Sequence, residues 1–499
     1  MIVGYAPAWK NIADIDSSRY THINLAFGEP QSDGTIVFNA GFSVPEYVEK
    51  LKKTGTRAIL GLGGWSGSAY FSEALKDATT RNKLIDETVG FIKTNHMDGV
   101  DIDWITSNPC NTRDPQNDSA NLLGFLRDLR GRFNSEFPQE SKVIALGVGL
   151  SPPVVGSQGR DAEANKDVSE YAGLVDYITV LAYDVNGPQS STTGPNAPLN
   201  YELGRGTQYS LISAIDSWTN AKFPANKILA GFSFYGRSLT AKVDMTVDSW
   251  NLYQPHEDGV PRGDDDDGLW ADKHCANPKP EYSGLWSYRN MRAQREKVLQ
   301  SPDVSALPWK RYWDSISLTP WVFNTNTKMF ISYDDPASLK AKAEYVKERG
   351  LGGVSVYDIT MDYNDELLNA ITSAIKMDTP VLPSAATSSL TSQSTQTSQT
   401  VDSTTPTESQ TSSNPPSSNT SPAPEPLPSS SSSSGSGNSW STLHAGDGCN
   451  GQQSYRCLAQ DGKGSNFLVC ASGVWIQQQC GSGTACVQNG NYIYCDWPR

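Results

Sequence analysis

Two carboxylates, Asp101 and Asp103, stand two residues apart in the run DGVDIDWI at residues 98–105. Alternate side chains of a β-strand share a face, so Asp101, Asp103 and position 105 are predicted to point the same way. A pair of inward carboxylates is costly to bury unless it is hydrogen-bonded or functional, and it raises the pKa of one member. The apolar residues between the acids argue against a solvated acidic loop. We therefore predict an acid pair at the centre of a functional site.

The elements that would position this pair are eight short apolar runs, which we predict to be strands alternating with amphipathic helices. Such alternation is typical of the α/β class, and eight repeats predict a closed parallel (β/α)8 TIM barrel. The segment between the seventh and eighth runs is too long for one crossover helix, so we expect an inserted subdomain at about residues 240–333. The predicted strands are Ile2–Tyr5, His22–Phe27, Ala58–Leu62, Gly99–Trp104, Val143–Gly149, Tyr177–Tyr183, Ile228–Tyr235 and Gly353–Tyr357.

Two of the predicted helices have clear signals. Asp335 is a predicted N-cap with Pro336 at the first helical position, and this helix is expected to run to Gly350. A second helix is expected to begin near Asp118 because leucines recur on one face. These leucines are Leu122, Leu123, Leu126 and Leu129.

An aromatic residue stands at or near the carboxyl end of nearly every predicted strand. Active sites of such barrels lie at this end, and aromatic rings stack on the apolar faces of pyranose units. The set therefore predicts a sugar-binding cleft, although ordinary core packing is the alternative for any single ring. The residues are Tyr5, Phe27, Trp65, Trp104, Tyr183, Tyr235 and Tyr357.

The composition excludes several classes of partner. The 499 residues contain 40 Lys and Arg against 54 Asp and Glu, a net charge of −14, which argues against nucleic acid and anionic membranes. No run approaches the roughly 18 apolar residues of a membrane span. The five histidines form no ligand cluster and no CxxC pair occurs, so we predict neither metal nor cofactor. For the acidic run at residues 264–267 we favour a solvated loop over a calcium site.

Composition also divides the chain into parts. Residues 1–377 hold the predicted barrel. Residues 378–439 are dominated by Ser, Thr, Pro and Gln and are expected to be an extended, O-glycosylated linker. Residues 440–499 form a small cysteine-rich module. N-glycosylation sequons begin at Asn117 and Asn419.

The cysteines predict an oxidising compartment. Six of the eight lie between Cys449 and Cys495, which indicates a disulfide framework whose pairing the sequence leaves open. Cys110 follows the fourth strand and Cys275 lies in the insertion, both on the cleft side, so we expect these two to pair. The chain starts directly on a predicted strand, so we expect its signal peptide to be absent from this numbering. We expect a secreted monomer, extracellular or associated with a cell wall.

The large domain resembles the fungal-type chitinases of glycoside hydrolase family 18. That family carries a DxxDxDxE motif on its fourth strand, matched here from Asp98 to position 105. The run GLGGW at residues 61–65 resembles its SxGG motif, and LAYD at residues 181–184 resembles its MxYD motif. The resemblance covers most of residues 1–377. It implies chitin and chitooligosaccharides as ligands and an α+β wall for the insertion.

The resemblance also implies residue roles in a substrate-assisted mechanism, in which the N-acetyl oxygen of the substrate attacks the anomeric carbon. The last Glu of the motif would protonate the leaving oxygen. Asp103, next to Asp101, would orient the N-acetyl group, and Tyr183 would hydrogen-bond its carbonyl. Asp184 would assist this machinery, and Tyr5 and Phe27 match residues that line the central sugar subsite.

The sequence departs from the family where the acid should be. Position 105 is Ile, which has no proton to give, and losing a general acid costs about 10²–10⁴ in rate. Thr106 stands where relatives usually have Tyr, and Tyr357 where they usually have Trp. We predict a chitin-binding, chitinase-like protein that sequesters chitooligosaccharides and is catalytically impaired or dead. The alternatives are an active endochitinase in chitin catabolism or fungal wall remodelling, in which another acid serves, and a wall-anchored structural protein.

The cysteine-rich tail resembles a family 19 carbohydrate-binding module, which binds chitin. The match is the run CGSGTAC at residues 480–486, with Gly473-Val474-Trp475 before it. The resemblance implies sugar-stacking rings, although one Trp of so small a module should be core. The candidates are Trp475, Tyr492, Tyr494 and Trp497.

Overall fold

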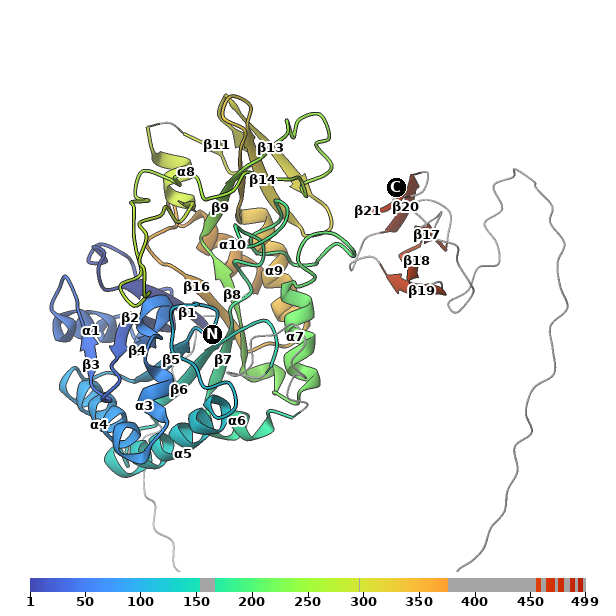
Figure 1. Ribbon diagram of the computed structural model, residues 1–499. Coiled ribbons are helices and arrows are strands. Elements are labelled where there is room, and N and C mark those ends of the chain that lie inside the picture. Colours follow the sequence, from blue (N-terminus) through green and yellow to red (C-terminus); the bar gives the residue numbers. More distant parts are fainter. Residues whose placement is uncertain are drawn as a thin grey trace, which may run out of the picture. The chain divides into compact units, whose positions relative to one another are not determined.

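The computed structural model describes residues 1–152, 167–295 and 297–375 of the large domain (Figure 1). In the C-terminal part it describes residues 455–458, 464–471, 474–479, 485–489 and 492–496. The chain divides into two compact units, Met1–Asp378 and Thr379–Arg499. The predicted linker and the sequon at Asn419 lie outside the described residues. The sequon at Asn117 is exposed, as an acceptor must be.

Eight parallel strands close into a barrel, and all eight strands expected from the sequence are present. The ring order is β1, β2, β4, β5, β6, β7, β8 and β16, and β1 closes the ring by pairing with both β2 and β16. The predicted TIM barrel is confirmed. The strands are β1 (Ile2–Pro7), β2 (His22–Pro30), β4 (Arg57–Gly63), β5 (Gly99–Trp104), β6 (Val143–Val148), β7 (Tyr177–Val180), β8 (Ile228–Ser233) and β16 (Gly353–Tyr357), with β3 (Ile36–Phe38) added antiparallel to β2.

Helices cover the outer face of the barrel, which is why its strands are apolar along most of their length. The two helices with clear sequence signals are confirmed. In α9, Asp335 accepts a hydrogen bond from the Ser338 N–H and Pro336 is the first residue, while α5 buries three of its four predicted leucines. The helices are α1 (Val44–Lys53), α2 (Gly64–Gly67), α3 (Phe71–Leu75), α4 (Ala78–Thr94), α5 (Asp118–Glu136), α6 (Ser169–Leu174), α7 (Leu211–Asn220), α9 (Pro336–Glu348) and α10 (Glu366–Ile375), with a 3₁₀ turn at Ala225–Lys227.

The insertion between β8 and β16 is a five-stranded antiparallel sheet in the order β10, β9, β15, β14, β13, with its own apolar core (Figure 1). It begins at Tyr235, five residues before the predicted boundary, because β9 follows β8 almost directly and the apolar run continues through the joint. The elements are β9 (Tyr235–Thr240), β10 (Leu285–Ser287), α8 (Tyr288–Ala293), β11 (Leu299–Ser301), β12 (Val304–Ser305), β13 (Trp309–Asp314), β14 (Thr319–Asn324) and β15 (Met329–Ser332).

The C-terminal unit contains a three-stranded sheet and a hairpin. The sheet is formed by β17 (Tyr455–Cys457), β18 (Asn466–Ala471) and β19 (Val474–Gln479), and the hairpin by β20 (Ala485–Asn489) and β21 (Tyr492–Asp496). A disulfide from Cys457 to Cys486 joins the two.

The structure describes three of the four candidate sugar-stacking residues of this unit, and one of these three is buried. Trp475 is only 5% exposed, so it is a core residue and not a sugar platform. Tyr492 and Tyr494 belong to β21, and Trp497 lies outside the described residues.

Among the helices that the structure describes, none is long and apolar enough to cross a membrane.

Candidate functional site

Asp101 and Asp103 point into the barrel from β5, as the alternation of a strand predicts. They are 0% and 5% exposed. The Oδ2 atom of Asp101 accepts hydrogen bonds of 2.6 Å from the Tyr5 hydroxyl on β1 and of 2.6 Å from the Asn24 amide on β2. Asp103 lies against β6, where a Cβ on Gly147 would be 2.1 Å from Asp103 Oδ1, so only glycine leaves room for this carboxylate.

The two carboxyls differ in their tendency to hold a proton. Burial raises the pKa of Asp101 to about 6, although the hydrogen bonds from Tyr5 and Asn24 act to lower it. Burial and then the charge of Asp101 raise the pKa of Asp103 well above its usual range. Asp103 Oδ1 has no hydrogen-bond partner among the described residues. Of the two carboxyls, Asp103 therefore has the greater tendency to hold a proton.

An aromatic cluster lies at the carboxyl ends of the strands above this pair. The Tyr357 ring centroid lies 5.7 Å from that of Tyr5, 6.5 Å from that of Tyr183 and 6.3 Å from that of Tyr235. Phe27 continues the cluster, 5.9 Å from Tyr5. Burial raises the pKa of Tyr183 well above its usual range, so its hydroxyl stays protonated and can donate a hydrogen bond. The structure thus brings together five of the seven rings expected in the cleft.

The other two expected rings lie elsewhere. Trp104 is 4% exposed and stacks on Phe71 of α3, with ring centroids 5.1 Å apart. It alternates with Asp103 along β5 and so faces the helices, and its assignment as a sugar contact is wrong. Trp65 follows β4 in α2 and is 48% exposed, free to meet a ligand from solvent.

Ile105 directly follows β5, and its backbone is held firmly. Its N–H donates to the Ser68 hydroxyl at 2.8 Å, and its carbonyl accepts from the Asn111 amide at 2.9 Å. The Ser68 hydroxyl also lies 3.1 Å from the Asp103 carbonyl oxygen, to which it donates. The position is therefore well fixed beside the acid pair, and its side chain carries no group that can give a proton.

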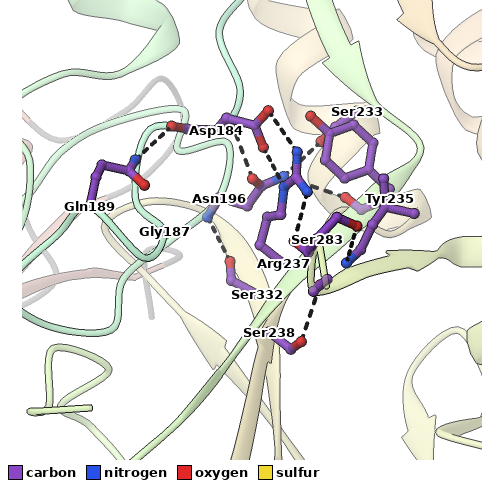
Figure 2. Close-up of polar contacts among 12 residues, drawn as sticks. Asp184, Gly187, Gln189, Asn196, Ser233, Tyr235, Arg237, Ser238, Ser283 and Ser332 are labelled. Carbon is purple, nitrogen blue, oxygen red and sulfur yellow. Dashed lines mark hydrogen bonds and ion pairs between the residues drawn. The ribbon is translucent and has the colours of Figure 1, made fainter. Parts of the chain in front are cut away.

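A polar network joins the loop after β7 to the insertion, and Figure 2 shows its contacts. The Asp184 carboxylate accepts from Arg237 Nε at 2.7 Å and from Arg237 Nη2 at 3.1 Å, and this guanidinium lies 5.1 Å from the Tyr235 ring centroid. The buried Asn196 side chain accepts from the Asp184 N–H at 3.2 Å and donates to the Ser233 hydroxyl at 3.2 Å (Figure 2). These bonds fix Asp184, whose φ is +56°, at the rim of the site.

Four residues of this site were not expected from the sequence. Asn24 had a usable signal, because it is a polar residue inside an apolar strand. Trp9 stacks on Phe27 at 6.4 Å and is exposed, so it extends the aromatic cluster beyond the strand ends. Arg237 and Asn196 had no such signal, since their partners are distant in sequence.

The acidic run at residues 264–267 is only partly the solvated loop that its composition suggested, because Asp265 and Asp266 are exposed and the other two acids are not. Asp264 and Asp267 are buried. Asp264 Oδ2 accepts from the Ser287 N–H at 2.8 Å, and Asp267 Oδ2 accepts from the N–H groups of Gly263 and Gly284 at 2.7 and 3.0 Å. The described residues include no group of three or more His, Cys, Asp or Glu that could hold a metal ion.

Comparison with known proteins places these features in a family. The profile of glycosyl hydrolases family 18 matches residues 1–362. A chitinase-like effector of Moniliophthora roreri is 31% identical over 388 residues, covering 74% of this chain and 91% of that protein. One of Moniliophthora perniciosa is 30% identical and covers 74% of this chain and 86% of that protein. The crystal structure of a chitinase from Rhizomucor miehei superposes with a TM-score of 0.68 at 30% identity, covering 75% of this chain and 99% of that one.

Proposed function

The chain belongs to glycosyl hydrolases family 18 and is chitinase-like, and from this premise we propose that it binds chitooligosaccharides in the barrel cleft without turning them over at more than a small residual rate. The observation that carries this proposal is Ile105 at the end of β5. It stands two residues beyond Asp103, where the resemblance to the family places the proton donor.

The contacts around the acid pair favour binding. The partly exposed rings of Phe27, Tyr183 and Tyr357 lie at the carboxyl ends of the strands, and the protonated Tyr183 hydroxyl is available to a carbonyl such as that of an N-acetyl group. Asp103 has an unpartnered, buried oxygen that an N-acetyl amide would satisfy. A sugar that supplies these missing hydrogen bonds can displace water from the site. Its binding costs little reorganisation, because the protein groups are already in place.

The same geometry disfavours hydrolysis. A glycosidic oxygen leaves poorly without a proton, and losing a general acid costs about 10²–10⁴ in rate, roughly 3–5 kcal/mol. Two other carboxyls that follow barrel strands have partners of their own. Asp184 is paired with Arg237, and Asp358 is buried and paired with Lys10 at 3.1 Å. Asp103 faces inward and is needed for the N-acetyl group, so we assign the role of donor to none of these three.

The test is to measure turnover and binding on the same preparation. We expect a fluorogenic chitotriose substrate to be hydrolysed at a small residual rate, while calorimetry with unlabelled chitooligosaccharides detects binding. Asp103→Asn is the matched control, because any residual rate that arises in this site should fall in it. A rate within about tenfold of an active family chitinase assayed in parallel would contradict the proposal and favour the active endochitinase.

We extend the proposal to the C-terminal unit, as a chitin-binding module that holds the secreted protein on insoluble chitin. Two linked sites on one polymer give avidity that neither site has alone. Deleting residues 378–499 should therefore weaken binding to insoluble chitin by at least about tenfold and leave the affinity for soluble oligomers unchanged. If the truncated protein binds no soluble oligomer by calorimetry, the barrel is not a sugar-binding site. In this role the protein acts as a monomer that sequesters soluble fragments.

A further inference from the structure

A segment of the insertion, residues 268–282, leaves the edge of the insertion sheet and returns to it, and we call it the strap. Its base is fixed by the two buried acids of the acidic run. Asp264 is hydrogen-bonded to Ser287 of β10, and Asp267 is hydrogen-bonded to Gly263 and Gly284 on either side of the strap. Within the strap, Trp270 and Glu281 pair in antiparallel fashion, with N–H···O distances of 3.0 Å in both directions. The strap is therefore a defined hairpin.

The tip of the strap is fastened to the barrel. A disulfide joins Cys275 to Cys110 in the loop after β5, as expected from the sequence. The buried Asp272 carboxylate accepts from the Asn108 amide at 2.8 Å. Lys273 forms an ion pair of 2.8 Å with Glu29 of β2. Covalent and polar bonds thus hold one short hairpin against β2 and against the loop after β5.

The strand order of the barrel shows which sides of its mouth the strap connects. The insertion leaves the ring between β8 and β16, which are seventh and eighth in order, whereas β2 and β5, to which the strap tip is fastened, are second and fourth. These pairs lie on opposite halves of the ring. Figure 1 shows the strap, in yellow-green, extending from the insertion toward the blue strands β1 and β2. The strap therefore joins the two facing walls of the barrel mouth.

We propose that the strap closes the barrel mouth on one side, so that a chitooligosaccharide reaches the aromatic cluster only by a free chain end. The inference rests on the proposed sugar binding in this cleft. An open groove accepts an internal segment of a polymer laid in from above. A groove whose walls are joined across one side accepts a chain that slides in or stops against the strap, and both require an end.

The loop after β5 makes the closure relevant to the site. Asn111 stands next to Cys110 and holds the Ile105 carbonyl, so the disulfide fastens the same loop that carries position 105. Closure also slows exchange, because a ligand must leave by the path through which it arrived. Soluble oligomers have many more chain ends per unit mass than long chains do. The strap thus favours the binding and retention of soluble oligomers and disfavours binding to internal segments of long chains.

The experiment compares two probes by calorimetry on the full chain: chitohexaose, and chitohexaose carrying a bulky group at each end. We expect the wild-type protein to bind the blocked probe at least about tenfold more weakly than the plain one. In Cys110→Ser/Cys275→Ser, further opened by Asp272→Ala, the difference should shrink to about threefold or less. Lys279→Ala, an exposed substitution within the strap, keeps the disulfide and both polar fastenings and serves as the matched control, so it should discriminate like the wild type.

A second variant guards against misfolding of the first. Replacing residues 271–280 with Asn-Gly closes the Trp270–Glu281 pair with a two-residue turn and removes the tip, and Cys110→Ser removes the unpaired thiol. It should also bind both probes alike. Equal binding of both probes by the wild type would overturn the strap proposal, as would undiminished discrimination in both opened variants. Failure of every variant to bind plain chitohexaose would instead overturn the proposed function on which it rests.

Discussion

The inner face of β5 and the end of the same strand differ in how their chemistry is supported. On the inner face, Asp101 is hydrogen-bonded from β1 and β2, and Asp103 fits against a glycine of β6. At the strand end, the backbone N–H and carbonyl of Ile105 are hydrogen-bonded to the side chains of Ser68 and Asn111. The inner face depends on several neighbouring strands, whereas the function of the strand end depends on the identity of one side chain.

This difference separates binding from proton transfer. In the proposed function, sugar contacts are distributed over the aromatic cluster, the acid pair and the Asp184–Arg237 pair, so one substitution removes a fraction of the affinity. A general acid is a single group at a single place, and one substitution removes it entirely. A binding protein can therefore arise from an enzyme of this fold with its cleft almost intact.

The largest expected effect comes from restoring the acid. Ile105→Glu places a carboxyl beside the acid pair, where burial and the negative charge shared by that pair raise its pKa so that it can act as a proton donor. We expect chitotriose turnover at least about 10²-fold above the wild type. Adding Thr106→Tyr and Tyr357→Trp should raise it further, and adding Asp103→Asn should abolish the gain because the N-acetyl group loses its orienting carboxyl.

Partial recovery is the expected result, because a displacement of about 1 Å costs roughly 10²-fold. If a folded triple variant binds chitooligosaccharides and cleaves none, then the inner face has diverged as well. The contrast between the inner face of β5 and the end of that strand would then be wrong.

The next effect tests whether binding is distributed. Tyr357→Ala removes the ring that contacts three others of the cluster, and it should weaken chitooligosaccharide binding by about 10–100-fold in calorimetry. Trp104→Phe is the matched aromatic control. It should lower the free energy of unfolding, since Trp104 stacks on Phe71, and leave the affinity within about twofold. A loss of affinity in the control equal to that in Tyr357→Ala would place Trp104 back in the cleft.

Much of the fold followed from the sequence, because strands buried on both faces are visible as short apolar runs. The inward direction of Asp101 and Asp103 followed from alternation alone. Applied consistently, the same rule would have placed Trp104 on the outer face, so its assignment to the cleft came from its position at a strand end. The start of the insertion was misplaced because the apolar run crosses from β8 into β9 without a turn signal.

The tertiary partners of polar residues could not be predicted in the same way. Asp264 and Asp267 belong to a run of acids that looks solvated, and they are buried because backbone N–H groups converge on them from β10 and its approach. Asn196 acquires its role from Asp184 and Ser233, which lie on different elements. Such convergence depends on topology, which local composition does not encode.

A smaller effect concerns pH. The folded-state pKa of Asp103 is raised, so between the unfolded value, about 3.9, and the folded value the native protein holds a proton that the unfolded chain has released. Stability therefore falls as pH rises through this window, by up to about 1.4 kcal/mol per unit. Asp103→Asn should remove this contribution, so urea unfolding from about pH 4 to 7 should give a flatter curve for the variant. Parallel curves for the two proteins would contradict the assignment of the proton.

The smallest effect is expected at the rim. Asp184 is exposed enough for solvent to screen its pair with Arg237, so Asp184→Ala should change the free energy of unfolding by less than about 1 kcal/mol. The buried Asn196 is the informative comparison, because Asn196→Ala leaves its partners unsatisfied and should cost about 1–3 kcal/mol. If chemical denaturation gave the same loss in the free energy of unfolding for both variants, the rim pair would contribute as much to stability as the buried Asn196.

The disulfide from Cys110 to Cys275 spans 165 residues, and β6, β7, β8 and β9 all lie within that span. The chain between the two cysteines is thus a covalent ring. A protease that cuts one peptide bond anywhere in this ring produces a nicked molecule and no free fragment, since both sides of the cut stay attached through the sulfur bridge. In an environment rich in proteases, cleavage and loss of the barrel would be separate events, and the second would require a reductant or another cut.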